Sequence, residues 1–322
     1  MFEINYEINV VTHLKIYIYT FNSHYNTFFF KFNLYSKLIG IIRNSLDQAN
    51  LQMDLRSLYD WTVRWRMSFN LSKCKVMHLG RESIHQNRHY YFDIQMFVSD
   101  ISFILDNTLN ERDLGIIINN KLNWQDHINQ ITMKANVILG RLKKTFVNWK
   151  PSIFRILYKA YIRPLLEYAS STWYAIKKSQ IKQIEKVQRR ATKCVPQLRD
   201  MTYDERLKAL GLTTLQDRRI RGDLILYYKI QSGFNKVNWF HPNEISPASR
   251  IEGPAGSIRG ASNIYKQTAS NCESRRNFFA NRVIDHWNKL PEQVKNAINV
   301  NEFKIKYDRD FCSVNRLTVL NV

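Results

Sequence analysis

The sequence predicts an α+β fold in which a small sheet with one helix is followed by a mostly helical region. Two observations carry this prediction. Apolar residues first recur at helical spacing and then in short strand-like runs that end at turn signals. From Trp124 onward they recur at three- and four-residue steps. At 322 residues, with 44% hydrophobic residues, the chain is long enough for two domains and a sizeable core.

Residues 1–36 differ from the rest of the chain in composition. Phe, Ile, Lys, Asn and Tyr supply 22 of these 36 positions. The longest uncharged stretch, Ile16 to Phe30, has 15 residues and includes polar ones, so it is too short and too polar to span a bilayer. No secretory cleavage pattern follows it. Because these residues have AT-rich codons, we expect a non-homologous or disordered segment that derives from non-coding sequence or a decayed start. An aromatic β segment is the alternative.

Residues 37–123 carry both helical and strand-like patterns. A helix is predicted from Ser45 to Met67, with Leu51 and Leu55 in its apolar stripe. The polar pair Ser99-Asp100 is expected to be a turn. We therefore expect one helix packed on a small antiparallel sheet. The strand-like runs are Cys74–Leu79, Tyr90–Ile94, Ile101–Leu105 and Leu114–Ile118.

Residues 124–234 are predicted to form basic helices. Pro151 suits the first turn of a helix, and Pro164 should kink or end that helix. Thr202-x-x-Glu205 is typical of a capping box at the start of another helix. Two further segments follow in the chain: a loop-rich linker at 235–274 and a closing helical segment at 275–322.

The charge balance indicates a polyanionic partner. The net charge is +21, from 48 Lys and Arg against 27 Asp and Glu, and Lys134 to Lys229 holds 22 basic and 7 acidic residues. Helices with uncompensated positive faces suit a phosphate backbone, so nucleic acid is the first candidate and an anionic membrane surface the second. The alternative is that these side chains only solvate helix surfaces. The candidate phosphate contacts are Lys182, Lys186, Arg189, Arg190 and Lys193 on one helix and Arg218, Arg219 and Arg221 on the next.

Other kinds of site find little support. The four cysteines are scattered without a CxxC pair, so neither a zinc site nor a disulfide framework is implied. No Gly-rich phosphate loop, HExxH or GxSxG motif occurs. His127, beside Asp126, is expected to be a surface or boundary residue rather than a catalytic one. Lys73 and Lys75, where a polar turn enters a strand, are either a phosphate-facing edge or solvated strand ends.

Several stretches, taken together and in order, resemble the reverse transcriptase of non-LTR retrotransposons of the jockey, LINE-like type. The resemblance covers about residues 37–311 and corresponds to the downstream part of such an enzyme. It implies the end of the polymerase palm at 37–123, a helical thumb at 124–234 and the C-terminal region. The stretches are LQMDLRSLYDW, WRMSFNLSKCKVMHLG, ERDLGIIINNKLNWQDHI, KANVILGRLKKTF, LYKAYIRPLLEYASSTW, IEKVQRRATK, YDERLKALGLTTLQDRRIRGDLI and FFANRVIDHWNKLP.

The resemblance also assigns roles to residues. Lys73 falls in a motif D-like stretch and would be the general acid that protonates the departing pyrophosphate. Leu114, Gly115 and Ile116 would belong to the primer grip, where the glycine lets the primer backbone come close. The implied partners are RNA and DNA, as a primer–template duplex contacted mainly through its phosphate backbone, with no membrane. The implied location is intracellular, in the nucleus or the cytoplasm.

The catalytic signature of the family is altered in this chain. In the family, Phe or Tyr is followed by Ala-Asp-Asp, and the two aspartates hold the Mg²⁺ pair. Here Leu34 and Tyr35 occupy the positions of the aspartates, and the sequence has no Asp-Asp pair. We therefore expect no Mg²⁺ at the catalytic position and no polymerisation by this chain alone. The alternatives are a co-opted nucleic-acid- or protein-binding scaffold without enzymatic activity and a pseudogene product that does not fold stably.

Overall fold

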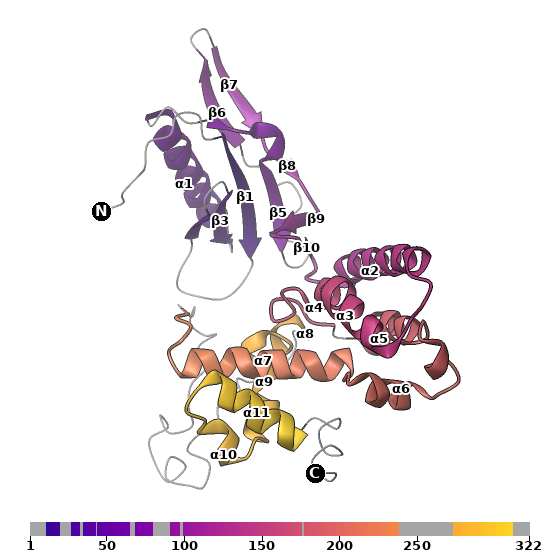
Figure 1. The fold of residues 1–322 in the computed structure, drawn as a ribbon. Helices are drawn as coiled ribbons and strands as arrows, with labels where there is room; N and C mark the ends of the chain where they lie inside the picture. Colours follow the sequence, from indigo (N-terminus) through magenta and orange to yellow (C-terminus); the bar gives the residue numbers. More distant parts are fainter. Residues whose placement is uncertain are drawn as a thin grey trace, which may run out of the picture. The chain divides into compact units, whose positions relative to one another are not determined.

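The computed structural model describes residues 11–19, 27–32, 35–42, 44–64, 68–79, 91–96, 99–175, 177–237 and 273–311. The chain divides into two compact units, Met1–Asn123 and Trp124–Val322. The first unit contains strands and one long helix, and the second consists of helices (Figure 1). The division falls where the sequence predicts the change from sheet to helices. The α+β class is therefore confirmed.

The first unit is built on a six-stranded sheet with the order β2-β3-β1-β5-β8, with β4 also paired to β1. Two further strand pairs, β6–β7 and β9–β10, are antiparallel hairpins outside this sheet. The elements are β1 Val11–Tyr19, β2 Thr27–Phe32, β3 Tyr35–Ile41, α1 Ser45–Arg64, β4 Ser68–Phe69, η1 Leu71–Lys73, β5 Lys75–Leu79, β6 Tyr91–Met96, β7 Ser99–Ile104, β8 Asp106–Asn107, β9 Asn110–Asp113 and β10 Ile116–Asn119.

The expected antiparallel direction is wrong for the main sheet. β1 is parallel to β3, β4 and β5, and β5 is parallel to β8, while β2–β3 is the one antiparallel pair in the sheet. A parallel arrangement needs a crossover connection, and α1 supplies it between β3 and β5. The pair Ser99-Asp100, expected to be a turn, begins β7 instead.

The N-terminal segment contributes strands to this sheet. β1 and β2 both come from the first 36 residues, and β1 lies between β3 and β5. Residues 11–19 and 27–32 therefore form strands, as the aromatic β alternative expects, and are not a disordered segment. The inference of disorder from AT-rich codons failed here, because aromatic and β-branched residues favour strands whatever codons encode them.

α1 packs closely on β3. Its buried residues include Leu51 and Leu55, and Leu51 contacts the sheet at Gly40. A Cβ atom at Gly40 would lie 3.0 Å from both δ carbons of Leu51. The helix begins with a side-chain cap, since the Asp47 N–H donates to Asn44 Oδ1 at 2.8 Å.

The second unit contains two packed groups of helices. α2 contacts α4 and α5 in the first group, and α7 contacts α9 and α11 in the second (Figure 1). The elements are α2 Gln125–Thr145, α3 Pro151–Leu157, the π turn η3 Tyr158–Ile162, α4 Arg163–Glu167, α5 Lys178–Thr192, η4 Pro196–Leu198, α6 Tyr203–Leu210, α7 Leu215–Gln231, α8 Glu273–Arg276, α9 Phe279–Asn288, α10 Glu292–Lys295 and α11 Val300–Phe311.

Two local predictions for this unit are confirmed. The Thr202–Glu205 capping box is present, because the Thr202 N–H donates to Glu205 Oε2 at 2.7 Å and the Glu205 N–H donates to Thr202 Oγ1 at 3.4 Å. Pro164 lies two residues after the end of the π turn, and its helix ends three residues later at Glu167. A proline lacks the N–H of a regular helix, and the wider hydrogen-bond spacing of η3 accommodates that loss.

Candidate nucleic-acid interface

Helix α5 presents a row of exposed basic side chains. All five residues that the sequence predicts on this helix and its C-cap are exposed: Lys182, Lys186, Arg189, Arg190 and Lys193. The opposite side is buried and includes Ile184, Val187 and Ala191. The helical period explains this division, since residues at three- and four-residue steps share one face. From Lys182 to Lys193 the row covers about 16 Å of the helix axis.

Two arginines of the row are held in place by neutral groups. The guanidinium of Arg189 lies over the Tyr203 ring, 4.0 Å from its centroid, and Arg190 Nη1 donates to Asn136 Oδ1 at 3.2 Å. Neither contact neutralises a charge. Both orient the guanidinium groups, so less side-chain entropy is lost when an anion binds.

The one acid of α5 is turned to the inside. Glu185 is buried, and its carboxylate accepts hydrogen bonds from the Tyr203 hydroxyl and, at 3.1 Å, from the Leu215 N–H. Burial raises the pKa of Glu185, which these two hydrogen bonds partly offset. Gln188 extends the network by donating to Tyr203 Oη at 2.8 Å and accepting from the Tyr158 hydroxyl. The exposed face of α5 therefore carries no carboxylate.

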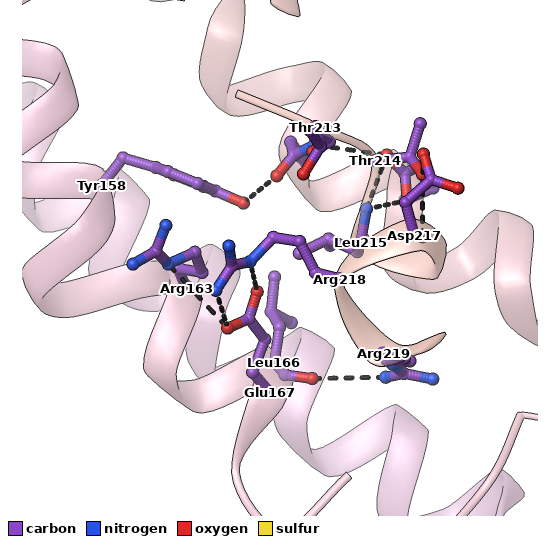
Figure 2. A network of polar contacts seen from close by, with 12 residues as sticks. Tyr158, Arg163, Leu166, Glu167, Thr213, Thr214, Leu215, Asp217, Arg218 and Arg219 are labelled. Carbon is purple, nitrogen blue, oxygen red and sulfur yellow. Dashed lines mark hydrogen bonds and ion pairs between the residues drawn. The ribbon is translucent and has the colours of Figure 1, made fainter. Parts of the chain in front are cut away.

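The three arginines predicted on α7 have internal partners instead. Arg218 pairs with Glu167, with its Nη2 2.9 Å from Oε2 (Figure 2). Arg221 binds Asp308 through two hydrogen bonds, at 2.5 and 2.6 Å. The sequence predicts both as phosphate contacts, but their charges are paired with acids that lie 51 and 87 residues away in the chain.

Arg219 is the most buried of the three, with 6% of its surface exposed. It donates to the Leu166 carbonyl at 3.2 Å, and its guanidinium lies 4.2 Å from the Trp173 ring centroid. Burial lowers its pKa to about 10, so it stays protonated at neutral pH. A buried cation on an aromatic face is a structural element of the core, not a surface contact.

His127 is also buried rather than at the surface, with 1% exposure. Its ring meets Trp173 edge-on at 4.8 Å. Burial, and then the charges of Arg219 and Lys134, lower its pKa to about 4, so the imidazole is neutral at physiological pH. The helical period places His127 beside buried Ile128 and Ile131, and the sequence could not distinguish this site from a polar boundary.

In the first unit, Lys73 ends the short turn η1 and is exposed. Lys75 begins β5 and pairs with Asp106, with Nζ 2.5 Å from Oδ2. Tyr35 begins β3, and Leu34 lies outside the described residues. The strand registers align position 37 with 15 and 15 with 75, so the N-terminal ends of β3 and β5 lie at the same end of the sheet, on either side of β1.

The predicted primer-grip residues lie in the β9–β10 hairpin. Leu114 and Gly115 form its turn, with φ values of 45° and 86°, and Ile116 begins β10 and is buried. The expected strand from Leu114 therefore starts two residues later. The left-handed backbone at Gly115 explains the glycine without any ligand, because L side chains disfavour that region.

The comparisons with known proteins give little further information. No protein-family model matches the chain, and no solved structure matches it. An uncharacterized protein of Caenorhabditis elegans is 31% identical over 124 residues, which are 38% of this chain and 63% of that protein. The chain thus spans less than two thirds of the length of this curated relative. The likeness carries neither a family assignment nor an activity.

No helix among the described residues is both long and apolar enough to cross a membrane. No group of three or more His, Cys, Asp or Glu that could hold a metal ion lies within the described ranges. At the altered signature, a leucine side chain offers no oxygen ligand and a tyrosine offers a phenol in place of a carboxylate. The residues at positions 34 and 35 do not fit a Mg²⁺ pair.

Proposed function

We propose that this chain is a fragment of an RNA-directed DNA polymerase of a non-LTR retrotransposon, which keeps affinity for a primer–template duplex but does not polymerise by itself. The sequence motifs motivate the enzyme class. The observation that carries the binding role is the exposed basic row on α5, whose only acid is buried. An affinity of this kind comes mainly from phosphate contacts and is independent of base sequence.

The acids of the helical unit support this proposal, because most of them form ion pairs, hydrogen bonds or helix caps with other residues. Between Lys134 and Lys229 the chain has 22 basic and 7 acidic residues. Five of the seven acids have internal roles: ion pairs of Glu167 and Asp223, hydrogen bonds of buried Glu185, and helix caps formed with Glu205 and Asp217. The α5 row is therefore left with a positive field that a polyanion can neutralise.

The loss of polymerisation follows from the donor chemistry at positions 34 and 35. A hard divalent cation needs oxygen ligands, preferably carboxylates, and Leu34 and Tyr35 do not supply them. Lys73 could still donate a proton as an exposed ammonium. Without the metal-dependent nucleotide transfer, however, no pyrophosphate would depart for it to protonate. Incorporation of nucleotides on a primed RNA template with Mg²⁺ or Mn²⁺ would contradict this part of the proposal.

Duplex binding is tested by reversing charges on α5. The triple variant Lys182→Glu, Lys186→Glu and Lys193→Glu changes three exposed side chains. A matched control reverses Lys208, Lys236 and Lys289, which are exposed elsewhere in the second unit, so the net charge is the same. We expect the α5 variant to lose binding to an RNA–DNA duplex and the control to retain most of it. Equal losses would mean that only net charge matters, and the assignment to α5 would be wrong.

A further inference from the structure

A second group of cations lies on α3, η3 and α4, where the sequence analysis predicts no site. Arg155, Lys159 and Arg163 follow one another at four-residue steps, which keeps them on one side of the helix. The π turn η3 preserves this alignment, because its wider turns leave a four-residue step on the same face. The opposite side is buried and includes Phe154, Tyr158, Ile162 and Leu166.

Arg218 of α7 joins these three residues. Figure 2 shows Arg163 and Arg218 converging on the carboxylate of Glu167, with Arg163 Nε 3.9 Å from Oε2. Only Arg163 and Arg218 pair with this carboxylate, so the four cations and Glu167 together keep a net charge of three. In the part of the chain that the structure describes, the Arg155 and Lys159 side chains have no ion-pair or hydrogen-bond partner.

The electrostatics of Lys159 agree with this crowding. Partial burial, followed by the positive charges of Arg163, Arg155 and Arg218, lowers the pKa of Lys159. All three arginines therefore act on the same ammonium group. An anion bound among these groups would relieve their mutual repulsion.

We propose that Arg155, Lys159 and Arg163, together with Arg218, form a binding site for a phosphate group and prefer a dianionic phosphomonoester to a singly charged phosphodiester. The attraction between charges grows with their product, so a compact group of cations favours the more highly charged anion. Guanidinium groups also match phosphate oxygens in geometry. This site goes beyond the proposed function, because it needs no polymer. The α5 row, by contrast, spreads its charges along a helix.

Pyridoxal 5′-phosphate is a suitable probe, because it combines a phosphomonoester with an aldehyde. The neutral amine of a lysine condenses with the aldehyde, with loss of water, and borohydride reduces the imine to a stable amine that peptide mass spectrometry locates. We expect Lys159 to react faster with this reagent than exposed Lys182 and Lys186 do. Pyridoxal, which lacks the phosphate, is the matched reagent. The ratio of the two rate constants isolates the phosphate contact from the intrinsic reactivity of each amine.

The variant Arg155→Gln should lower that ratio at Lys159 by about 1.4- to fivefold, the range for one exposed charge contact. Arg141→Gln, at an exposed arginine on α2, should leave the ratio unchanged. Inorganic phosphate should protect Lys159 more than chloride at equal ionic strength does. If Lys159 shows the same ratio as Lys182, or if phosphate protects no better than chloride, the proposal is wrong.

Two oligonucleotides of one sequence, with and without a 5′-phosphate, distinguish the possible sources of the phosphate. Stronger protection by the phosphorylated one would assign the site to a nucleic-acid end. Protection by inorganic phosphate alone would support a site for a small anion. The charge-reversed α5 variant should keep the ratio at Lys159, so failure of the duplex-binding proposal would be visible separately.

Discussion

The Glu167 carboxylate on α4 accepts hydrogen bonds from both Nε and Nη2 of Arg218 on α7. This pair joins two helices of the second unit across 51 residues of sequence. Its geometry is the two-pronged arrangement in which a guanidinium and a carboxylate match best. Arg218 is therefore a structural residue whose charge also adds to the field around Lys159.

We predict that Arg218→Gln destabilises the chain more than Lys186→Gln does. Loss of the arginine leaves a half-buried carboxylate without its main partner, at a cost of about 1–2 kcal/mol. Lys186 is exposed, so its replacement should change the free energy of unfolding by less than about 0.5 kcal/mol. Urea unfolding of both variants measures the difference. Equal midpoints would show that the ion pair contributes nothing.

The stability of the second unit should depend on pH through His127. Its folded-state pKa is lowered from 6.5 to about 4, so between these values the unfolded chain binds a proton that the folded chain does not. The free energy of unfolding should therefore fall as the pH is lowered through this window, by about 1–3 kcal/mol in total. The difference in unfolding free energy between the wild type and His127→Gln isolates the contribution of His127. Glu185 is present in both proteins, and its raised pKa changes stability with pH in the opposite direction. A difference that does not change from pH 7 to pH 4 would contradict the prediction.

The phosphate contacts that we propose for α5 can be counted from the salt dependence of duplex binding. In the variant Lys182→Ala, Lys186→Ala and Lys193→Ala, three cations are removed without reversal of charge. The slope of log affinity against log salt concentration on a duplex should become shallower by about 2 to 3, since each contact contributes about 0.9 on B-form DNA. The same three alanines at Lys208, Lys236 and Lys289 should leave the slope within experimental error. A slope that changes equally in both variants would place the contacts elsewhere.

The close approach of α1 to β3 predicts the effect of a methyl group at Gly40. Gly40→Ala places a carbon 3.0 Å from the two δ carbons of Leu51 and should destabilise the first unit by about 1–3 kcal/mol. With Leu51→Ala in the same chain, the added methyl group has room. The double variant should therefore lose less unfolding free energy than the sum of the losses in the two single variants. Circular dichroism during urea unfolding of the two single variants and the double variant gives this coupling. Strictly additive costs would mean that the two residues do not touch.

Local sequence patterns were sufficient for much of the helical unit. The Thr202–Glu205 capping box, the irregularity before Pro164 and the exposed row on α5 all follow from residues within a few positions of one another. A helix places side chains by its own period, so its faces can be assigned without knowledge of distant partners. The excess of positive charge is likewise a property of composition alone.

Tertiary structure decided which arginines are available to a partner and in which direction the strands pair. Arg218 and Arg221 resemble surface cations until Glu167 and Asp308 are brought against them, and Arg219 until Trp173 lies beneath it. β1 could be recognised as a strand, but its place between β3 and β5 depends on hydrogen bonds to segments far along the chain. Sequence spacing fixes the local backbone and its faces, whereas pairing and burial depend on contacts between distant residues that no short-range pattern records.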